Sequence, residues 1–335
     1  MVTGTGVLRR LGRRSLAAAG GLALDRLLGE PPVPDRAHPV ALLGTGLAAL
    51  ERRLYADRRA PGAALAAAAV AGAAVAGAAL RSPAAAAWLA TSGRALHEAA
   101  LRVAAALETG DLDAARAALP WLVGRDPSRL GAPAIARAAI ESVAENTTDA
   151  VVAPALWAVA GGAPGTLVHR AADTLDSMVG YRDERYRRFG AAAARLDDAL
   201  AFVPARVTAA LVVLCRPGRA PAVRRAVAVD APAHPSPNAG VAEAAFAAAL
   251  DVRLGGDANR YGTVIERRPV LHGAGRVPGP VDVRAAVALS LAVTRALKAI
   301  LAAAGGAAPA VAAVRDRRRG DRGPDRAWAR GGSPP

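Results

Sequence analysis

The sequence predicts an all-α fold: a polytopic helical membrane protein in which polar helical segments and loops carry the functional site. Hydrophobic residues make up 53% of the 335 residues but aromatic residues only 3%, so alanine supplies much of the apolar surface. Residues 61–80 are uncharged over roughly the 20 residues that a helix needs to cross hydrocarbon. No segment alternates apolar and polar residues with a sustained period of two, which argues against more than a little sheet.

In the first half of the chain, residues 61–80 are the clearest membrane span, and their small residues suit close helix packing. Residues 15–28 are also apolar, but they are short and interrupted by Asp25. Residues 84–119 have the pattern of helices with polar faces, broken near Gly110. Asp111, directly after that break, is a suitable cap for a second helix.

In the second half, residues 133–160 predict one or two helices that end at Gly161 and Gly162. Residues 199–214 are apolar but contain Pro204 and Arg206, so we expect a re-entrant or interfacial segment there. Residues 254–262 have the composition of a glycine-rich turn, and residues 285–314 form a last apolar helix or pair of helices. The number of spans stays open at this point.

The net charge of +15 is nearly all arginine, because Lys298 is the single lysine. Both ends of the chain are basic, which predicts a basic N-terminal segment at 1–14, one membrane-integrated helical catalytic domain at 15–314 and a basic disordered tail at 315–335. No basic stripe is interleaved with aromatic residues, which disfavours nucleic-acid binding. One cysteine, Cys215, allows neither an internal disulfide nor a cysteine-rich metal site.

Acidic residues recur every four positions at Glu141, Glu145 and Asp149, along one slowly drifting helix face. Like charges at this spacing repel by about 0.2–0.5 kcal/mol per pair, and no basic residue lies between them. The pattern fits either a solvated face or a site that holds a cation. Asn146 adds a neutral oxygen ligand or a hydrogen-bond donor beside it.

Asp173 and Asp176 share a second helix face, and arginines follow at three-residue steps at Arg182, Arg185 and Arg188. Arginine forks match phosphate oxygens, so the triplet suits a polyphosphate, although pairing with neighbouring acids is the simpler alternative.

Asp197 and Asp198 point in different directions on a helix, and we expect at most one of them to reach the same site. Ser236 and Pro237 have the pattern of a helix start, with Asn238 just behind them. Free N–H groups at such a start can bind an anion, but a plain cap needs no function.

Taken together and in order, these motifs resemble one family, the CobD/CbiB proteins of cobalamin biosynthesis, the adenosylcobinamide-phosphate synthases. The resemblance covers about residues 20 to 300 and lies in the segments 24–32, 38–40, 123–126, 139–146, 174–186, 195–198, 204–206, 236–245 and 254–256. The sequence departs from the family pattern at Ala201 and Pro127, among others, but no departure removes an acidic or arginine position.

The resemblance implies a multi-pass protein of the inner cell membrane that acts late in adenosylcobalamin assembly. Its reaction would join a carboxyl group of adenosylcobyric acid to (R)-1-amino-2-propanol, or to its O-phosphate, with consumption of ATP and help from Mg²⁺. The implied partners are these substrates, membrane lipid and other enzymes of cobamide assembly.

The site expected from the resemblance combines acids with phosphate-binding groups. The metal set is Glu141, Glu145 and Asp176, which with Asp197 also form the catalytic set. Substrate binding is expected from Asn146, Arg125, Arg182, Arg185, Ser236 and Asn238.

Other classes of protein remain open at the level of sequence. A polytopic transporter also places acids and arginines among apolar helices, but here the charged segments lie mostly outside the clean spans. A lipid phosphotransferase would use clustered aspartates and a divalent ion, yet its expected Asp-Gly-Ala-Arg arrangement is absent. A non-catalytic subunit of the cobamide assembly machinery would show no ATP turnover when purified.

Overall fold

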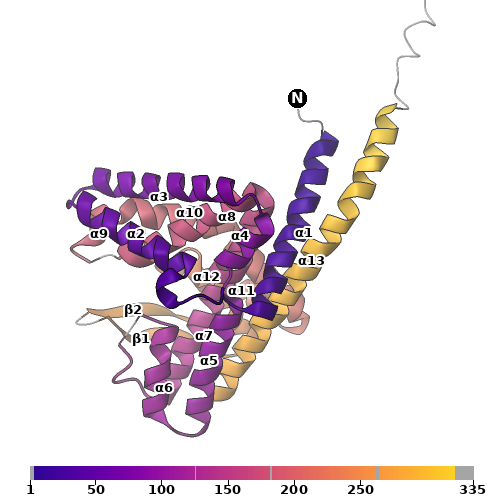
Figure 1. The fold of residues 1–335 in the computed structure, drawn as a ribbon. Helices are drawn as coiled ribbons and strands as arrows, with labels where there is room; N and C mark the ends of the chain where they lie inside the picture. Colours follow the sequence, from indigo (N-terminus) through magenta and orange to yellow (C-terminus); the bar gives the residue numbers. More distant parts are fainter. Residues whose placement is uncertain (1–3, 125, 182, 262–263, 321–335) are drawn as a thin grey trace, which may run out of the picture.

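The computed structural model describes residues 4–124, 126–181, 183–261 and 264–320, which form a helical protein with one two-stranded sheet (Figure 1). The first helices are α1 (Gly4–Leu28), α2 (Pro39–Leu54), α3 (Arg59–Leu80), α4 (Pro83–Ala90), α5 (Gly93–Glu108) and α6 (Leu112–Ala118). The others are α7 (Ala132–Thr147), a π-helical segment (Thr148–Val152), α8 (Ala153–Val179), α9 (Tyr186–Phe189), α10 (Ala191–Cys215), α11 (Ala220–Val229), α12 (Ala239–Leu250) and α13 (Pro280–Gly320).

Four helical segments of the described chain are long and apolar enough to cross a membrane: Arg59–Leu80, Ala132–Val179, Ala191–Cys215 and Pro280–Ala313. This confirms the prediction of a polytopic helical fold. The basic N-terminal residues belong to α1, which begins at Gly4 and continues without a break into the apolar part, and the division of the chain at residue 14 stays a prediction. Most of the predicted tail lies outside the described residues, while α13 itself continues to Gly320.

Proline does not interrupt α10, which runs through Pro204 for 25 residues instead of forming the expected re-entrant segment. A proline lacks the N–H that would pair with the carbonyl four residues earlier, here that of Leu200. The indole Nε1 of Trp157 on α8 donates to that carbonyl oxygen at 3.1 Å. The missing backbone bond is thus replaced from a neighbouring helix, and the segment keeps a length that can span a membrane.

The predicted helix end at Gly161 and Gly162 is a sharp kink inside α8. Gly162 adopts φ 66° and ψ −153°, and the helix resumes at Pro164. The carbonyl of Ala160, which Pro164 cannot bond, accepts a hydrogen bond of 2.7 Å from Arg14 Nη1 of α1. On the other side α3 packs tightly at this kink, where a Cβ on Gly77 would lie 2.5 Å from Pro164 Cα.

The segment predicted as a glycine-rich turn is a β-strand, and that prediction was wrong. Strand β1 (Leu254–Tyr261) pairs antiparallel with β2 (Val264–Leu271), with register irregularities on both sides of Gly256. Gly255 has φ 76°, and a side chain there would run into the carbonyl oxygen of Pro269. Glycine is therefore required for the strand to pair, and the same glycines hide the strand pattern in the sequence.

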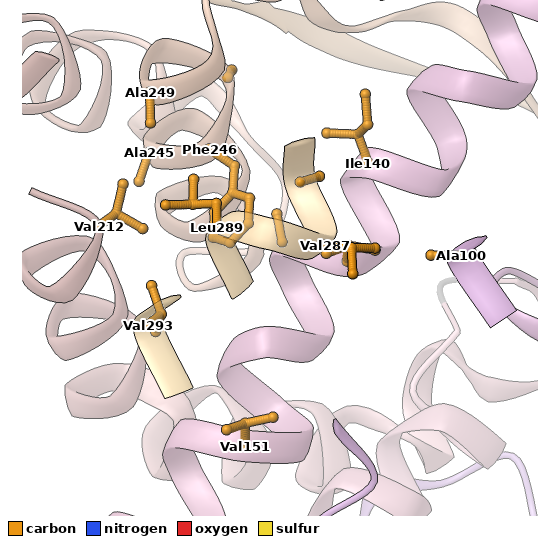
Figure 2. Packing of buried hydrophobic residues seen from close by; sticks show 14 of the residues in the cluster. Ala100, Ile140, Val151, Val212, Ala245, Phe246, Ala249, Val287, Leu289 and Val293 are labelled. Atoms are coloured by element: carbon orange, nitrogen blue, oxygen red, sulfur yellow. The ribbon is translucent and has the colours of Figure 1, made fainter. Parts of the chain in front are cut away.

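The main core lies where α5, α7, α10, α12 and α13 meet, and Figure 2 shows its centre. Phe246 of α12 contacts the region of Leu289 on α13, with Ile140 of α7 nearby, and all three side chains are fully buried. A smaller cluster joins α2, α3, α8 and α9 around Leu65, Leu175 and Phe189. Alanine is the commonest residue of the main core, which lets helices approach closely; α1 and α13, for instance, run side by side with Gly12 against Ala308 (Figure 1).

Candidate active site

Acidic side chains from four elements of the fold gather into one group, named here the carboxylate cluster. Its members are Glu145 of α7, Asp149 of the π-helical segment, Asp173 and Asp176 of α8, and Asp197 and Asp198 of α10. Electrostatic interactions connect Asp149 with Asp173, Asp197 and Glu145, and connect Asp176 with Asp198, Asp173 and Glu145. The fold therefore concentrates negative charge that the sequence spreads over more than fifty positions.

Specific contacts hold the helices of the carboxylate cluster together. Trp157 ties α8 to α10 through its bond to Leu200, and Thr148 Oγ1 of the π-helical segment donates to Thr208 Oγ1 of α10 at 3.0 Å. The π-helical turn ends at Val152, two residues before Pro154, whose missing N–H favours a widened turn. This wider turn carries Asp149, and π-helical turns occur frequently at functional sites.

Positive charge near the carboxylate cluster is provided by arginines that the sequence analysis did not assign. Arg170 Nη1 lies 2.9 Å from Asp173 Oδ2, one helical turn away. Asp176 Oδ1 is buried and has no hydrogen-bond partner among the described residues. An i,i+3 spacing could have revealed Arg170, but nothing in the sequence connects the cluster with Arg206, which reaches it through Asn238 from α10.

Asn238 and Ser236 have structural contacts at the start of α12. Ser236 Oγ accepts from the N–H groups of Asn238 and Ala239, but α12 begins at Ala239 with Asn238 as its N-cap, so the predicted helix start at Ser236 and Pro237 was two residues too early. Asn238 Nδ2 donates to the carbonyl of Asp198 at 2.8 Å, and its Oδ1 accepts from Arg206 at 2.6 Å. Its amide therefore connects α12 to the edge of the carboxylate cluster, and its role in binding substrate stays a prediction.

Glu141 contacts different groups from the other two predicted metal ligands, Glu145 and Asp176. Its side chain is 1% exposed, and Oε1 accepts from the N–H of Gly255 at 2.9 Å and lies 3.6 Å from Arg137 Nε. The base of the β-hairpin thus uses this carboxylate, whereas Glu145, one turn later, faces the carboxylate cluster. Within the described residues, no group of three or more His, Cys, Asp or Glu side chains is arranged to hold a metal ion. The metal set of Glu141, Glu145 and Asp176 stays a prediction.

Arg185 is bound by a different acid from those of the carboxylate cluster. Its Nη2 donates to Glu51 Oε1 of α2 at 3.0 Å, and its guanidinium stacks 4.3 Å from the centre of the Tyr55 ring. The hydrogen bond to Glu51 raises the pKa of Arg185 above its usual value. Arg125 and Arg182, the other predicted phosphate-binding arginines, lie outside the described residues.

Asp197 and Asp198 both interact electrostatically with Asp176, so the expectation that at most one reaches the site was wrong. The two carboxylates point in different directions on α10, yet each lies close enough to Asp176 of α8 to interact with it. Asp149 and Asp173 were recognised as members of acidic faces but not assigned to the site. Their spacing could have indicated that they belong to the site, since each lies one helical turn from an acid that was assigned to it.

Asn146, the remaining predicted binding residue, lies on α7 next to Glu145. It lines a cavity of about 340 Å³ between α5 and α7, together with Arg102 and Trp121. The cavity and the carboxylate cluster therefore share the C-terminal end of α7.

Comparison with known proteins shows which family this sequence matches. The model of the family described as CobD/Cbib protein matches residues 18–290. The cobalamin biosynthesis protein CobD of Mycobacterium tuberculosis H37Rv is 47% identical over 302 residues, which cover 86% of this chain and 95% of that protein. The protein of the same name from Chromobacterium violaceum is 42% identical over 287 residues, 80% of this chain and 89% of that protein. No solved structure matches the chain.

The matched residues include every member of the carboxylate cluster, the cavity beside it and the hairpin that binds Glu141. The family match extends over most of the chain, and the relatives are similar over nearly their whole length. The chain belongs to the CobD/CbiB family.

Proposed function

We propose that this protein is an ATP-dependent amide synthase of cobalamin biosynthesis, located in the cell membrane. It joins a carboxyl group of adenosylcobyric acid to (R)-1-amino-2-propanol or its O-phosphate. A role in cobalamin biosynthesis follows from membership of the family and from the names of the relatives.

One observation carries the proposal: the sequence segments that resemble the family's motifs meet in space. The motif acids Glu145, Asp176 and Asp197 come from three different helices, yet they interact in one carboxylate cluster. Crowding like charges in this way costs stability unless the charge is used. A reaction in which a cation binds a polyphosphate would use the negative charge of the cluster.

The donor chemistry of the carboxylate cluster fits Mg²⁺. Magnesium prefers oxygen ligands, and it is usually held by one or two carboxylates plus substrate phosphates rather than by a complete protein cage. Glu145 and Asp176, with its unpartnered Oδ1, are the described residues best placed to hold it. When bound, the ion would offset the charge of the phosphates during transfer.

The chemistry proceeds in two balanced steps. The substrate carboxylate attacks the γ-phosphorus of ATP, which forms an acyl phosphate and releases ADP. The amine then attacks the acyl carbon, the C–O bond to phosphate breaks, and amide and inorganic phosphate result. A carboxylate of the cluster accepts the proton that the ammonium group must lose before it can attack.

The direct test is an assay of the detergent-purified protein with adenosylcobyric acid, ATP, Mg²⁺ and either aminopropanol or its phosphate, followed by mass analysis of the corrinoid. We expect an ATP-dependent mass gain of one amide-linked amino alcohol, and the better amine identifies the substrate. No gain with either amine from folded protein would refute the proposal and favour a transporter or a non-catalytic subunit.

A further inference from the structure

The cavity between α5 and α7 has the composition of a small-molecule site. One face of α5 lines it from Ser92 to Arg102, and Ser142 and Asn146 of α7 line the opposite side. Its volume of about 340 Å³ is in the range of roughly 300–1,000 Å³ that is usual for ligand pockets. Leu96 and Leu122 are apolar members of a lining that is otherwise rich in polar and charged side chains, so the cavity suits a ligand that has both an apolar part and a polar edge.

A tryptophan stands exposed at the rim of this cavity. Trp121 is 76% exposed, although aromatic residues make up only 3% of the chain. Among the described residues, no ring–ring or cation–π contact involves its indole. A large ring left without a partner beside a polar cavity is suited to stack on a planar ligand.

The amide of Asn146 is oriented by a chain of hydrogen bonds. Its Nδ2 donates to the carbonyl and to Oγ of Ser142, and Ser142 Oγ in turn donates to the carbonyl of Leu122 at 2.8 Å. Both hydrogens of the amide nitrogen are used in this way. The group that remains for a ligand is the acceptor Oδ1, so the ligand should present a hydrogen-bond donor.

We propose that this cavity binds an adenine ring, stacked on Trp121 and with its exocyclic amino group donating to Asn146 Oδ1. Adenine combines the two required features, a flat π-face and an amino donor on its edge. The inference rests on the proposed function for the source of the ring, because both ATP and the adenosyl group of the corrinoid contain one. Glu145 directly precedes Asn146 on α7, so the cavity and the carboxylate cluster share the C-terminal end of that helix.

The test measures equilibrium binding to the purified full-length protein without turnover. One arm titrates ATP in the absence of corrinoid; the other titrates adenosylcobyric acid against the cyano form, in the absence of ATP. The variant Trp121→Ala should weaken binding of the adenine-containing ligand about fivefold or more, since stacking on an aromatic side chain contributes at least that much. Trp121 is exposed, so the variant should fold, and Val229→Ala, at a position 62% exposed on α11, is the control.

The two arms identify the source of the ring. A loss confined to ATP assigns the cavity to the nucleotide, and a loss confined to the adenosyl corrinoid assigns it to the second substrate. Unchanged affinity for both ligands overturns the inference, even if the protein forms the amide normally. Conversely, Trp121-dependent binding in a protein that forms no amide would leave the inference standing and remove the proposed function.

A second experiment tests the contact between the exocyclic amino group and Asn146 Oδ1, with adenosine and inosine as competitors of the adenine-containing ligand. Inosine lacks the exocyclic amino group and has a carbonyl oxygen in its place, which would face the Oδ1 acceptor. Wild-type protein should prefer adenosine, and Asn146→Ala should lose that preference. Equal competition by both nucleosides in the wild type would contradict the contact with Asn146.

Discussion

Glu145 marks the point where α7 passes into the π-helical segment, and several acids depend on its charge. It interacts electrostatically with Asp149, Asp176 and Asp197, which come from three different elements. Glu141, one turn earlier, instead supports the hairpin through Gly255. Two acids with the same spacing in the sequence therefore have separate roles, and mutation can distinguish them.

We predict that Glu145→Gln lowers amide formation on the order of 100-fold or more while the protein remains folded. The substitution keeps the shape of the side chain but removes the charge that a cation or a proton would use. Thermal unfolding should occur at an equal or higher temperature, because repulsion in the carboxylate cluster decreases. Asp113→Asn, at an exposed position of α6, is the matched control. Full activity in Glu145→Gln would exclude this residue from the site.

Two buried titratable groups make stability depend on pH in opposite directions. Burial raises the pKa of Asp25 from 3.8 to about 6, although the N–H of Arg94 partly offsets this. Burial, helped by the charge of Arg26, lowers the pKa of His97 from 6.5 to about 4. Asp25 thus adds stability that is present below about pH 4 and lost as the pH rises to 6. His97 adds stability that is present above pH 6.5 and lost as the pH falls to 4.

Because these contributions are similar in size, on the order of 3 kcal/mol each, they nearly cancel between pH 4 and 6.5 in the wild type. We predict that Asp25→Asn loses stability steeply when the pH is lowered from 7 to 5, since His97 then acts alone. Thermal unfolding in detergent over this range measures the slope. A slope equal to that of the wild type would show that Asp25 does not carry a raised pKa.

At the scale of elements, prolines shape the long apolar helices without breaking them. Pro154, Pro164 and Pro204 each leave unpaired the carbonyl four residues earlier. The Ser92 N–H donates to Ala150, Arg14 to Ala160 and Trp157 to Leu200. In apolar surroundings an unpaired carbonyl is costly, so these donors from other elements allow kinked helices to persist.

We predict that Arg14→Ala destabilises the protein by about 1–3 kcal/mol, because the Ala160 carbonyl at the kink of α8 loses its donor. Arg13→Ala is a closely matched control: it lies next to Arg14 on α1, is exposed, and removes the same charge. Thermal unfolding of both variants in the same detergent measures the difference. Equal unfolding temperatures would mean that the bond to Ala160 contributes nothing.

The helices could be predicted from the sequence more completely than the hairpin or the turns that join them. Long alanine-rich runs and the Asp111 cap, which accepts from Ala114 N–H at 2.9 Å, are local signals and were confirmed. The effect of Pro204 was not predictable, because its compensating donor, Trp157, is distant in sequence. Strand β1 escaped notice since glycines at positive φ replace the alternating pattern of an ordinary strand.

At the scale of the whole molecule, the fold determines which of the predicted site residues meet. Spacing along one helix correctly grouped Asp173 with Asp176, but it also grouped Glu141 with Glu145. The hairpin, more than a hundred residues later, redirects Glu141 through the Gly255 N–H. Likewise the packing of α10 against α8 brings both Asp197 and Asp198 to Asp176. Which acids join the cluster therefore depends on tertiary contacts between distant segments, and no local sequence pattern reveals these contacts.

We expect the same assembly of α7, α8 and α10 to make the stability of the whole protein depend on divalent cations. Folding forces the carboxylate cluster together, so its repulsion is present in the folded state and absent from the unfolded chain. A cation bound only by the folded state stabilises it by mass action. We therefore predict that Mg²⁺ together with ATP raises the unfolding temperature of the wild type.

The carboxyl group of Asp197 should account for part of this response. Without a cation, Asp197→Asn should unfold at a higher temperature than the wild type, by an amount typical of a single substitution, about 0.5–3 kcal/mol. With Mg²⁺ and ATP its gain should be smaller than that of the wild type, since less repulsion remains to be relieved. Asp113→Asn, remote from the cluster, should behave like the wild type in both conditions. If Mg²⁺ and ATP leave the unfolding temperature of the wild type unchanged, the cluster would no longer support a cation-assisted reaction. The repulsion would then have a structural role, such as keeping α8 and α10 apart.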